Sequence, residues 1–200
     1  MSGSAEKGPG IATAANVVTI VRVVAIFVWL AVAQAAGPAL PQQVSAPWAW
    51  TAALFILIAS TDSLDGHLAR SRNEVTDFGK FLDPIADKLV VVASLLVLMA
   101  QGLVSIWVVV IVVSREFLVS GLRMVVASKG VVVAASGLGK AKTATTMGAV
   151  GGYLVALALP QAWAPTAWLY GLSWIAMAVA VALTVWSGAD YLIKCWKHLS

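Results

Sequence analysis

The sequence predicts an all-α integral membrane protein with six transmembrane helices. Of its 200 residues, 60% are hydrophobic and only 11% are charged, and long apolar segments recur along the chain. A soluble domain of this size carries about 25% charged residues. This composition excludes the water-soluble fold classes.

Six segments are apolar enough to cross a bilayer, which requires about 20 mostly apolar residues. They run over residues 15–36, 48–70, 79–101, 104–128, 142–160 and 165–188. Glycine or proline stands at four of the five breaks between them, as expected where helices end. These residues are Gly37, Pro38, Pro41, Gly102, Gly130, Gly137, Gly139, Pro160 and Pro165.

Lysine and arginine mark the cytoplasmic side of a membrane protein. The loops at 37–47, 101–104 and 160–165 contain no charged residue, whereas the alternate connections and both terminal regions are basic. The basic residues are Lys7, Arg70, Arg72, Lys80, Lys129, Lys140, Lys142, Lys194 and Lys197. We therefore expect both termini in the cytoplasm. The N-terminus over residues 1–10 is expected to be flexible, and residues 190–200 a short amphipathic interfacial tail.

Six of the nine acidic residues lie within residues 62–88, between two apolar runs that are too short to span a membrane alone. The polar helix ends must then lie in the cytoplasmic half of the membrane zone, where each charge costs about 2.5–3.5 kcal/mol. We therefore expect a polar active-site cavity in that half. Glu74 and Asp77 are expected to be solvated loop residues, and His67 a packing or surface residue.

The acidic residues are spaced in pairs. Asp62 and Asp65 are three residues apart on one predicted helix, and Asp83 and Asp87 are four apart on the next, so each pair shares a helical face. Four unpaired carboxylates would repel one another, and hard cations such as Mg²⁺ or Mn²⁺ prefer oxygen ligands. Two such ions could clamp a pyrophosphate. The same acids could instead serve a proton relay or a cation transporter.

Small residues and an arginine accompany these acids. Gly66, Gly79 and the nearly as small Ala69 would let a ligand approach the backbone closely, although small residues can also simply aid helix packing. Arg70 lies one helical turn beyond Gly66, where it could meet phosphate oxygens.

Taken together, these positions match the pattern D-x2-D-G-x2-A-R-x8-G-x3-D-x3-D. It resembles the signature of the CDP-alcohol phosphatidyltransferases, and the resemblance covers nearly the whole chain, with the family domain expected over residues 11–189. The resemblance implies that two divalent ions, Mg²⁺ or Mn²⁺, are held by Asp62, Asp65 and Asp83. Asp87 would be the general base and could also be a ligand. The site of the CDP group would be shaped by Asp62, Gly66, Ala69, Arg70 and Gly79. The resemblance also argues strongly against the transporter hypothesis.

Flanking sequences resemble one branch of this family. They are FGKFLDPIADK (78–88), SREFLVSGLR (114–123) and LGKAKTATTMGA (138–149). The resemblance implies transfer of the phosphatidyl group from CDP-diacylglycerol to sn-glycerol 3-phosphate, giving phosphatidylglycerol phosphate and CMP. It also implies a homodimer. From the apolar spans and the basic loops, we expect a multi-pass protein of the cell membrane whose active site faces the cytoplasm. Inositol phosphate, serine or phosphatidylglycerol are alternative acceptors.

A glycerol 3-phosphate acceptor requires a cationic pocket. Arg115 and Arg123 are eight residues apart on one face of the fourth predicted helix, and Lys140 and Lys142 open the fifth. We expect these four residues to bind the acceptor phosphate. Arg115 could instead pair with Glu116 or with a core acid, and the lysines could anchor the helix at the cytoplasmic surface.

The first predicted helix carries Asn16, Thr19 and Arg22, which resemble an N-x2-T-x2-R pattern of the family. They are candidates for an edge of the cytidine or acceptor pocket, and the alternative is helix packing with a cytoplasmic anchor. Cys195 is the single cysteine, which excludes a disulfide framework and a cysteine metal site. The basic residues are scattered and form no stripe, so we expect no nucleic-acid partner.

Overall fold

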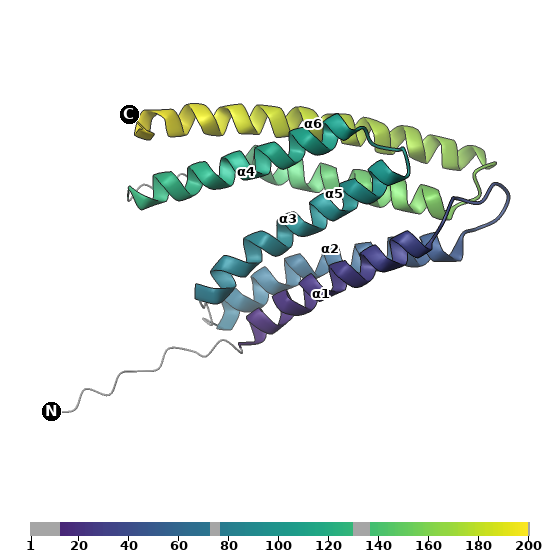
Figure 1. Ribbon diagram of the computed structural model, residues 1–200, viewed down its shortest axis with the longest axis horizontal. Coiled ribbons are helices and arrows are strands. Elements are labelled where there is room, and N and C mark those ends of the chain that lie inside the picture. The colour runs from purple at the N-terminus through teal and green to yellow at the C-terminus, as the bar shows by residue number, and fades with distance from the viewer. Residues whose placement is uncertain (1–12, 73–76, 130–136, 200) are drawn as a thin grey trace.

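The computed structural model describes residues 13–72, 77–129 and 137–199, except for the side chains of residues 14–15, 62–83 and 197–199. This part of the chain forms six α-helices and confirms the predicted all-α class (Figure 1). The helices are α1 (Ala14–Ala35), α2 (Ala46–Arg72), α3 (Asp77–Ala100), α4 (Ile106–Ser128), α5 (Gly137–Ala158) and α6 (Ala164–Leu199).

Local sequence explains several helix ends. Thr13 and Ser105 are the N-caps of α1 and α4, and their hydroxyls accept hydrogen bonds from the backbone N–H of Asn16 and Trp107. Just beyond the ends of α1 and α3, Gly37 and Gly102 adopt positive φ angles of 67° and 71°. Only glycine takes that conformation without strain, so both residues stop a helix at an expected break.

The helices form two halves. α1 packs against α2 and α3, α5 packs along α6, α4 packs on α6, and α2 meets α5 between the halves. In Figure 1 the halves lie close together at the right-hand end and separate toward the left-hand end, where α1 begins and α6 ends. The beginning of α1 and the end of α6 therefore lie on the same side of the bundle.

The core occupies the end of the bundle where the halves meet. Trp29 and Trp48 are almost fully buried, and their indole N–H groups donate to the carbonyls of Thr51 and Gly37 at 2.8 and 3.0 Å. The backbone N–H of Ser45 donates to the carbonyl of Ala158 at 2.8 Å, which ties the connection between α1 and α2 to the end of α5. Buried indoles and this hydrogen bond therefore join the helices at this end of the bundle.

The outer surface is strongly apolar, as expected of a membrane protein. Large side chains that are more than half exposed include Phe27, Trp107, Phe117, Trp168 and Trp174. Among the described residues, two helical segments are long and apolar enough to cross a membrane: Asn16–Ala35 and Ala164–Trp196. A shorter apolar segment covers Ala46–Thr61. Six membrane crossings and the orientation of the termini stay predictions.

Two predicted boundaries differ from the structure. α5 begins at Gly137, whereas the sequence places Gly137 and Gly139 in a break before a helix at 142. α6 runs without interruption to Leu199, whereas the sequence predicts a separate tail from residue 190. The helix continues because Tyr191 and Cys195 pack against Val119 and Val126 of α4. The interfacial position of the tail stays a prediction.

Candidate active site

A cavity of about 750 Å³ lies between the two halves of the bundle, and all six helices contribute to its wall. The lining residues lie from the middle of the bundle toward the end where α1 begins and α6 ends. The described lining includes two acidic and six basic side chains, namely Asp87, Glu116, Arg22, Lys88, Arg115, Arg123, Lys140 and Lys142. This excess of positive charge suits a ligand that carries phosphate groups.

Of the four acids in the predicted motif, Asp87 is the one whose side chain the structure describes. Its Oδ1 accepts a hydrogen bond from Nη1 of Arg22 at 3.2 Å, an ion pair that joins α3 to α1. The Arg22 side chain is only 4% exposed, whereas that of Asp87 is 53% exposed and faces the cavity. A buried arginine thus holds a carboxylate that a ligand can reach.

The first-helix candidates Asn16, Thr19 and Arg22 are all buried, with exposed fractions of 1%, 2% and 5%. Burial fits the helix-packing alternative for Asn16 and Thr19, but it argues against Arg22 as a cytoplasmic anchor. The ion pair with Asp87 and the position in the cavity wall connect Arg22 to the candidate site.

The other residues of the acidic motif lie within helices, but their side chains are outside the described residues. Asp62, Asp65, Gly66, Ala69 and Arg70 are in the last turns of α2. Gly79 and Asp83 are in the first turns of α3, the helix that carries Asp87. Among the side chains that the structure describes, no group of three acidic, histidine or cysteine residues could hold a metal ion. The donor type of the motif, four carboxylates on two consecutive helices, is the type that hard divalent cations prefer.

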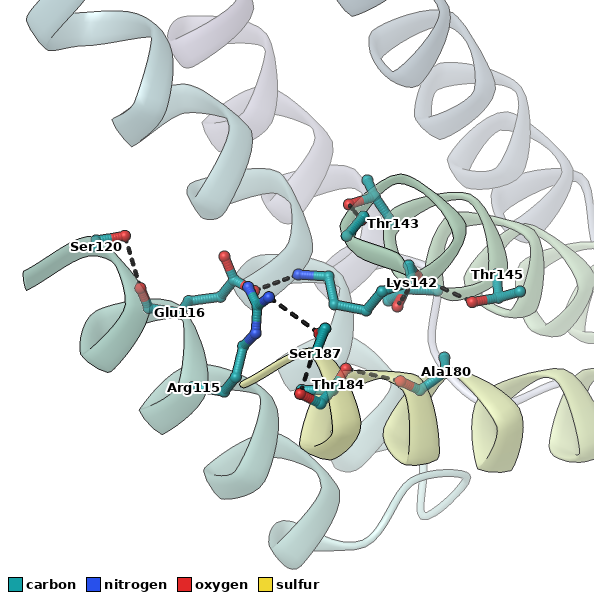
Figure 2. A network of polar contacts seen from close by, with 11 residues as sticks. Arg115, Glu116, Ser120, Lys142, Thr143, Thr145, Ala180, Thr184 and Ser187 are labelled. Atoms are coloured by element: carbon teal, nitrogen blue, oxygen red, sulfur yellow. Dashed lines mark hydrogen bonds and ion pairs between the residues drawn. The ribbon is translucent and has the colours of Figure 1, made fainter. Parts of the chain in front are cut away.

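Arg115, Glu116 and Lys142 form an ionic network that links α4 to α5 (Figure 2). Nη1 of Arg115 lies 3.1 Å from Oε1 of Glu116, and the ammonium group of Lys142 contacts the same oxygen. Each of these three side chains is at most 15% exposed. One carboxylate therefore compensates two cations that the sequence assigns to acceptor binding.

Two α6 residues complete the surroundings of Arg115. Its Nη2 donates to the hydroxyl of Ser187 at 3.0 Å, and Figure 2 shows this bond reaching from α4 to α6. A Cβ added at Gly188 would lie 3.1 Å from Cγ of Arg115, which is closer than ordinary contact. An alanine at position 188 would therefore require the Arg115 side chain to shift by a few tenths of an ångström.

Arg123 and Lys140 have a different environment. Both are exposed and line the cavity, and no described carboxylate is within ion-pair distance of either. The guanidinium carbon of Arg123 lies 5.9 Å from the ring centroid of Tyr191, which is a cation–π contact. The four predicted acceptor residues share one cavity with Asp87, but they fall into a compensated pair and an uncompensated pair.

Sequence reasoning does not identify Glu116, Ser187 and Tyr191 as site residues. Glu116 is noticed only as an alternative partner of Arg115. Ser187 and Tyr191 are four residues apart and share a face of α6. That spacing of two polar groups in an apolar helix is the signal that could have revealed them.

Comparison with known proteins identifies the family. A family model described as CDP-alcohol phosphatidyltransferase matches residues 12–186. A relative from Bacillus subtilis (strain 168), named CDP-diacylglycerol–glycerol-3-phosphate 3-phosphatidyltransferase, is 46% identical over 148 residues, covering 74% of each chain. A probable phosphatidylglycerophosphate synthase from Mycobacterium tuberculosis (strain ATCC 25618 / H37Rv) is 35% identical over 189 residues, covering 94% of this chain and 84% of its own. A third relative, from Yersinia pestis (strain Pestoides F) with the same name as the first, is 38% identical over 162 residues, covering 76% of this chain and 84% of its own. The cavity and the comparisons lead to the same conclusion: the chain belongs to the CDP-alcohol phosphatidyltransferases.

Proposed function

We infer that this enzyme transfers the phosphatidyl group from CDP-diacylglycerol to sn-glycerol 3-phosphate, giving phosphatidylglycerol phosphate and CMP. The observation that carries this inference is the cavity in which Asp87 and the basic residues of α4 and α5 lie together. The names of the relatives from Bacillus subtilis and Yersinia pestis describe the same donor and acceptor.

Asp87 is suited to accept the proton of the acceptor hydroxyl, because it is exposed to the cavity and held by Arg22. The acceptor oxygen then forms a bond to the phosphorus that carries the diacylglycerol. The bond from this phosphorus to the bridging oxygen breaks, and CMP departs with the electron pair. Among the described residues lining the cavity there is no cysteine or histidine, and its two serines, Ser120 and Ser187, both donate to backbone carbonyls. Direct transfer of the phosphatidyl group to the acceptor, without a covalent enzyme intermediate, is therefore the simplest mechanism.

We propose that Asp62, Asp65 and Asp83, with Asp87, hold two divalent ions, Mg²⁺ or Mn²⁺. When bound, these ions would neutralise the pyrophosphate of the donor. Gly66, Ala69, Arg70 and Gly79 would leave room for the CDP group and meet its phosphate oxygens. Their helical positions at the α2–α3 junction are compatible with both roles.

An apolar groove next to the cavity supports a lipid donor. It has a volume of about 470 Å³, lies between α2, α5 and α6, and is lined by Phe55, Val155 and Leu169 among others. Ala59 and Met147 line both the groove and the charged cavity. The head group could therefore enter the cavity sideways while the acyl chains stay in apolar surroundings.

We propose that all six helices span the cell membrane, with both termini and the cavity on the cytoplasmic side, and that the enzyme is a homodimer. The apolar outer surface and the common end of α1 and α6 support the membrane arrangement. The basic residues at that end favour the cytoplasm.

A labelling experiment tests the reaction. The purified protein is incubated with CDP-diacylglycerol, Mg²⁺ and glycerol 3-phosphate that carries a radioactive phosphate, and the lipid fraction is counted. We expect the label to enter a lipid with two phosphates, together with one CMP for each labelled lipid. CMP release without label in the lipid would assign a different acceptor or simple hydrolysis.

A further inference from the structure

The four cations proposed to bind the acceptor phosphate are not equivalent. Arg115 and Lys142 share the carboxylate of Glu116, and Arg115 also donates to Ser187. A phosphate that binds both cations must compete with a carboxylate that is already in place and largely shielded from water. This pair is therefore better suited to hold the cavity wall together than to be the main phosphate contact.

Arg123 keeps its charge available. Its contact with Tyr191 is made to the face of an aromatic ring, 5.9 Å from the guanidinium carbon to the ring centroid. Such a contact orients the guanidinium but adds no negative charge. The planar N–H edge of Arg123 thus remains suited to two oxygens of a phosphate.

Tyr191 adds a second donor at the same place. The residue is 6% exposed and lines the cavity, and its buried hydroxyl has no hydrogen-bond partner among the described residues. A buried hydroxyl without a partner costs free energy, so an oxygen of a bound ligand that accepts its hydrogen bond would remove that cost. The ring is fixed in this position by the apolar contacts of Tyr191 with Val119 and Val126.

We propose that the Tyr191 hydroxyl donates a hydrogen bond to the acceptor phosphate, which Arg123 binds beside it. The bound phosphate then supplies the hydrogen-bond acceptor that the hydroxyl lacks. The proposal rests on the proposed function and adds a specificity-determining residue from the end of α6. Arg115, Glu116 and Lys142 become positioning residues in this arrangement.

Tyr191→Phe tests the proposal, because it removes only the hydroxyl and keeps the ring below Arg123. A hydrogen bond to a charged group corresponds to a factor of roughly 10 to 100 in affinity. We expect the KM for glycerol 3-phosphate to rise by that factor, while kcat and the KM for CDP-diacylglycerol change less than about threefold. Tyr153→Phe is the matched control, because Tyr153 is a buried tyrosine (3% exposed) outside the cavity lining.

Two results of this kinetic comparison would overturn the proposal. One is an unchanged KM for glycerol 3-phosphate in Tyr191→Phe. The other is a rise in the KM for CDP-diacylglycerol without a rise in the KM for glycerol 3-phosphate, which would mean that the hydroxyl binds CDP-diacylglycerol. Thermal unfolding in detergent checks the fold of the variant. If the α4–α6 contact is intact, we expect an unfolding midpoint within about 2 °C of the wild type.

A binding measurement separates this proposal from the proposed reaction. Inorganic phosphate is titrated into the wild type and Tyr191→Phe without donor, and the upward shift of the unfolding midpoint is followed. We expect the variant to need roughly tenfold more phosphate for the same shift. Equal curves would contradict the role of Tyr191 even if turnover is confirmed. A clear difference would support it even if the wild type does not use glycerol 3-phosphate.

Discussion

Nη1 of Arg22 lies 3.2 Å from Oδ1 of Asp87, although the two residues are 65 positions apart in the chain. The contact joins the first half of α1 to the middle of α3 at the wall of the charged cavity. Because Arg22 is buried and Asp87 is not, the arginine holds a carboxylate that a ligand in the cavity can reach.

Replacement of Arg22 should affect the chemical step. In Arg22→Met, Asp87 loses its fixed partner, and a small displacement of a catalytic group can cost roughly 100-fold in rate. We expect kcat to fall by roughly 10- to 100-fold, whereas Arg22→Lys retains one charged donor and part of the activity. Single-turnover CMP release measures the step directly. Wild-type kcat in Arg22→Met would show that the ion pair has only a structural role.

Replacement of Asp87 should be more severe. Asparagine keeps the shape of the side chain but cannot accept the proton, and general-base catalysis contributes roughly 10²- to 10⁴-fold. We expect kcat of Asp87→Asn to fall by at least roughly 100-fold. Asp190→Asn is the matched control, because Asp190 pairs with Lys194 one turn away and does not line the cavity. Retained activity in Asp87→Asn would refute the assignment of the base.

Loss of the Glu116 carboxylate should destabilise the protein. Glu116→Gln leaves Arg115 and Lys142 without their shared anion in a largely shielded place, and breaking a buried pair costs about 3–5 kcal/mol. We expect a clear drop in the unfolding midpoint. Glu116→Gln combined with Lys142→Met should recover part of it, because the two residues are coupled. Additive effects of the two substitutions would contradict the network.

Gly188 should be more sensitive to substitution than another glycine of the same helix. In Gly188→Ala the new methyl group lies 3.1 Å from Cγ of Arg115 and forces that side chain to shift, which costs about 1–3 kcal/mol in a packed core. Gly171→Ala is the control, because nothing lies within 4 Å of its added Cβ and alanine favours the helix. Unfolding midpoints compare the two. Equal midpoints would mean that Arg115 does not depend on this opening.

Removal of divalent metal should abolish turnover. EDTA is expected to stop CMP release, and Mg²⁺ or Mn²⁺ in excess should restore it, because carboxylates bind these ions reversibly. Asp62→Asn and Asp65→Asn should raise the metal concentration needed for half-maximal rate. Full activity after exhaustive chelation would contradict the metal proposal.

The apolar runs and glycine breaks were sufficient to predict six helices, but not all of their bounds. The sequence predicts a separate interfacial tail from residue 190, because the apolar positions 191, 192, 195, 196 and 199 form a helical stripe that fits a membrane surface. In the structure, Tyr191 and Cys195 of this stripe pack on α4, while Leu192 and Trp196 are exposed. One sequence cannot show which part of a wide apolar stripe contacts protein.

The sequence predicts the members of the candidate site better than the contacts between them. The family resemblance assigns a catalytic role to Asp87, and the sequence assigns Arg115, Arg123, Lys140 and Lys142 to the acceptor phosphate. All five line one cavity. The division of the cations was not predictable, because it depends on the position of α5 relative to α4 and of α6 relative to both. Glu116 meets Lys142 only through that packing.

CMP release from CDP-diacylglycerol with a panel of acceptors and Mg²⁺ is the most direct test of the assigned reaction. We expect rapid release with glycerol 3-phosphate, and little release with inositol phosphate, serine, phosphatidylglycerol or no acceptor. Faster release with another acceptor would contradict the assigned reaction while leaving the family intact. No release with any acceptor, together with metal flux in liposomes, would contradict the enzymatic account itself.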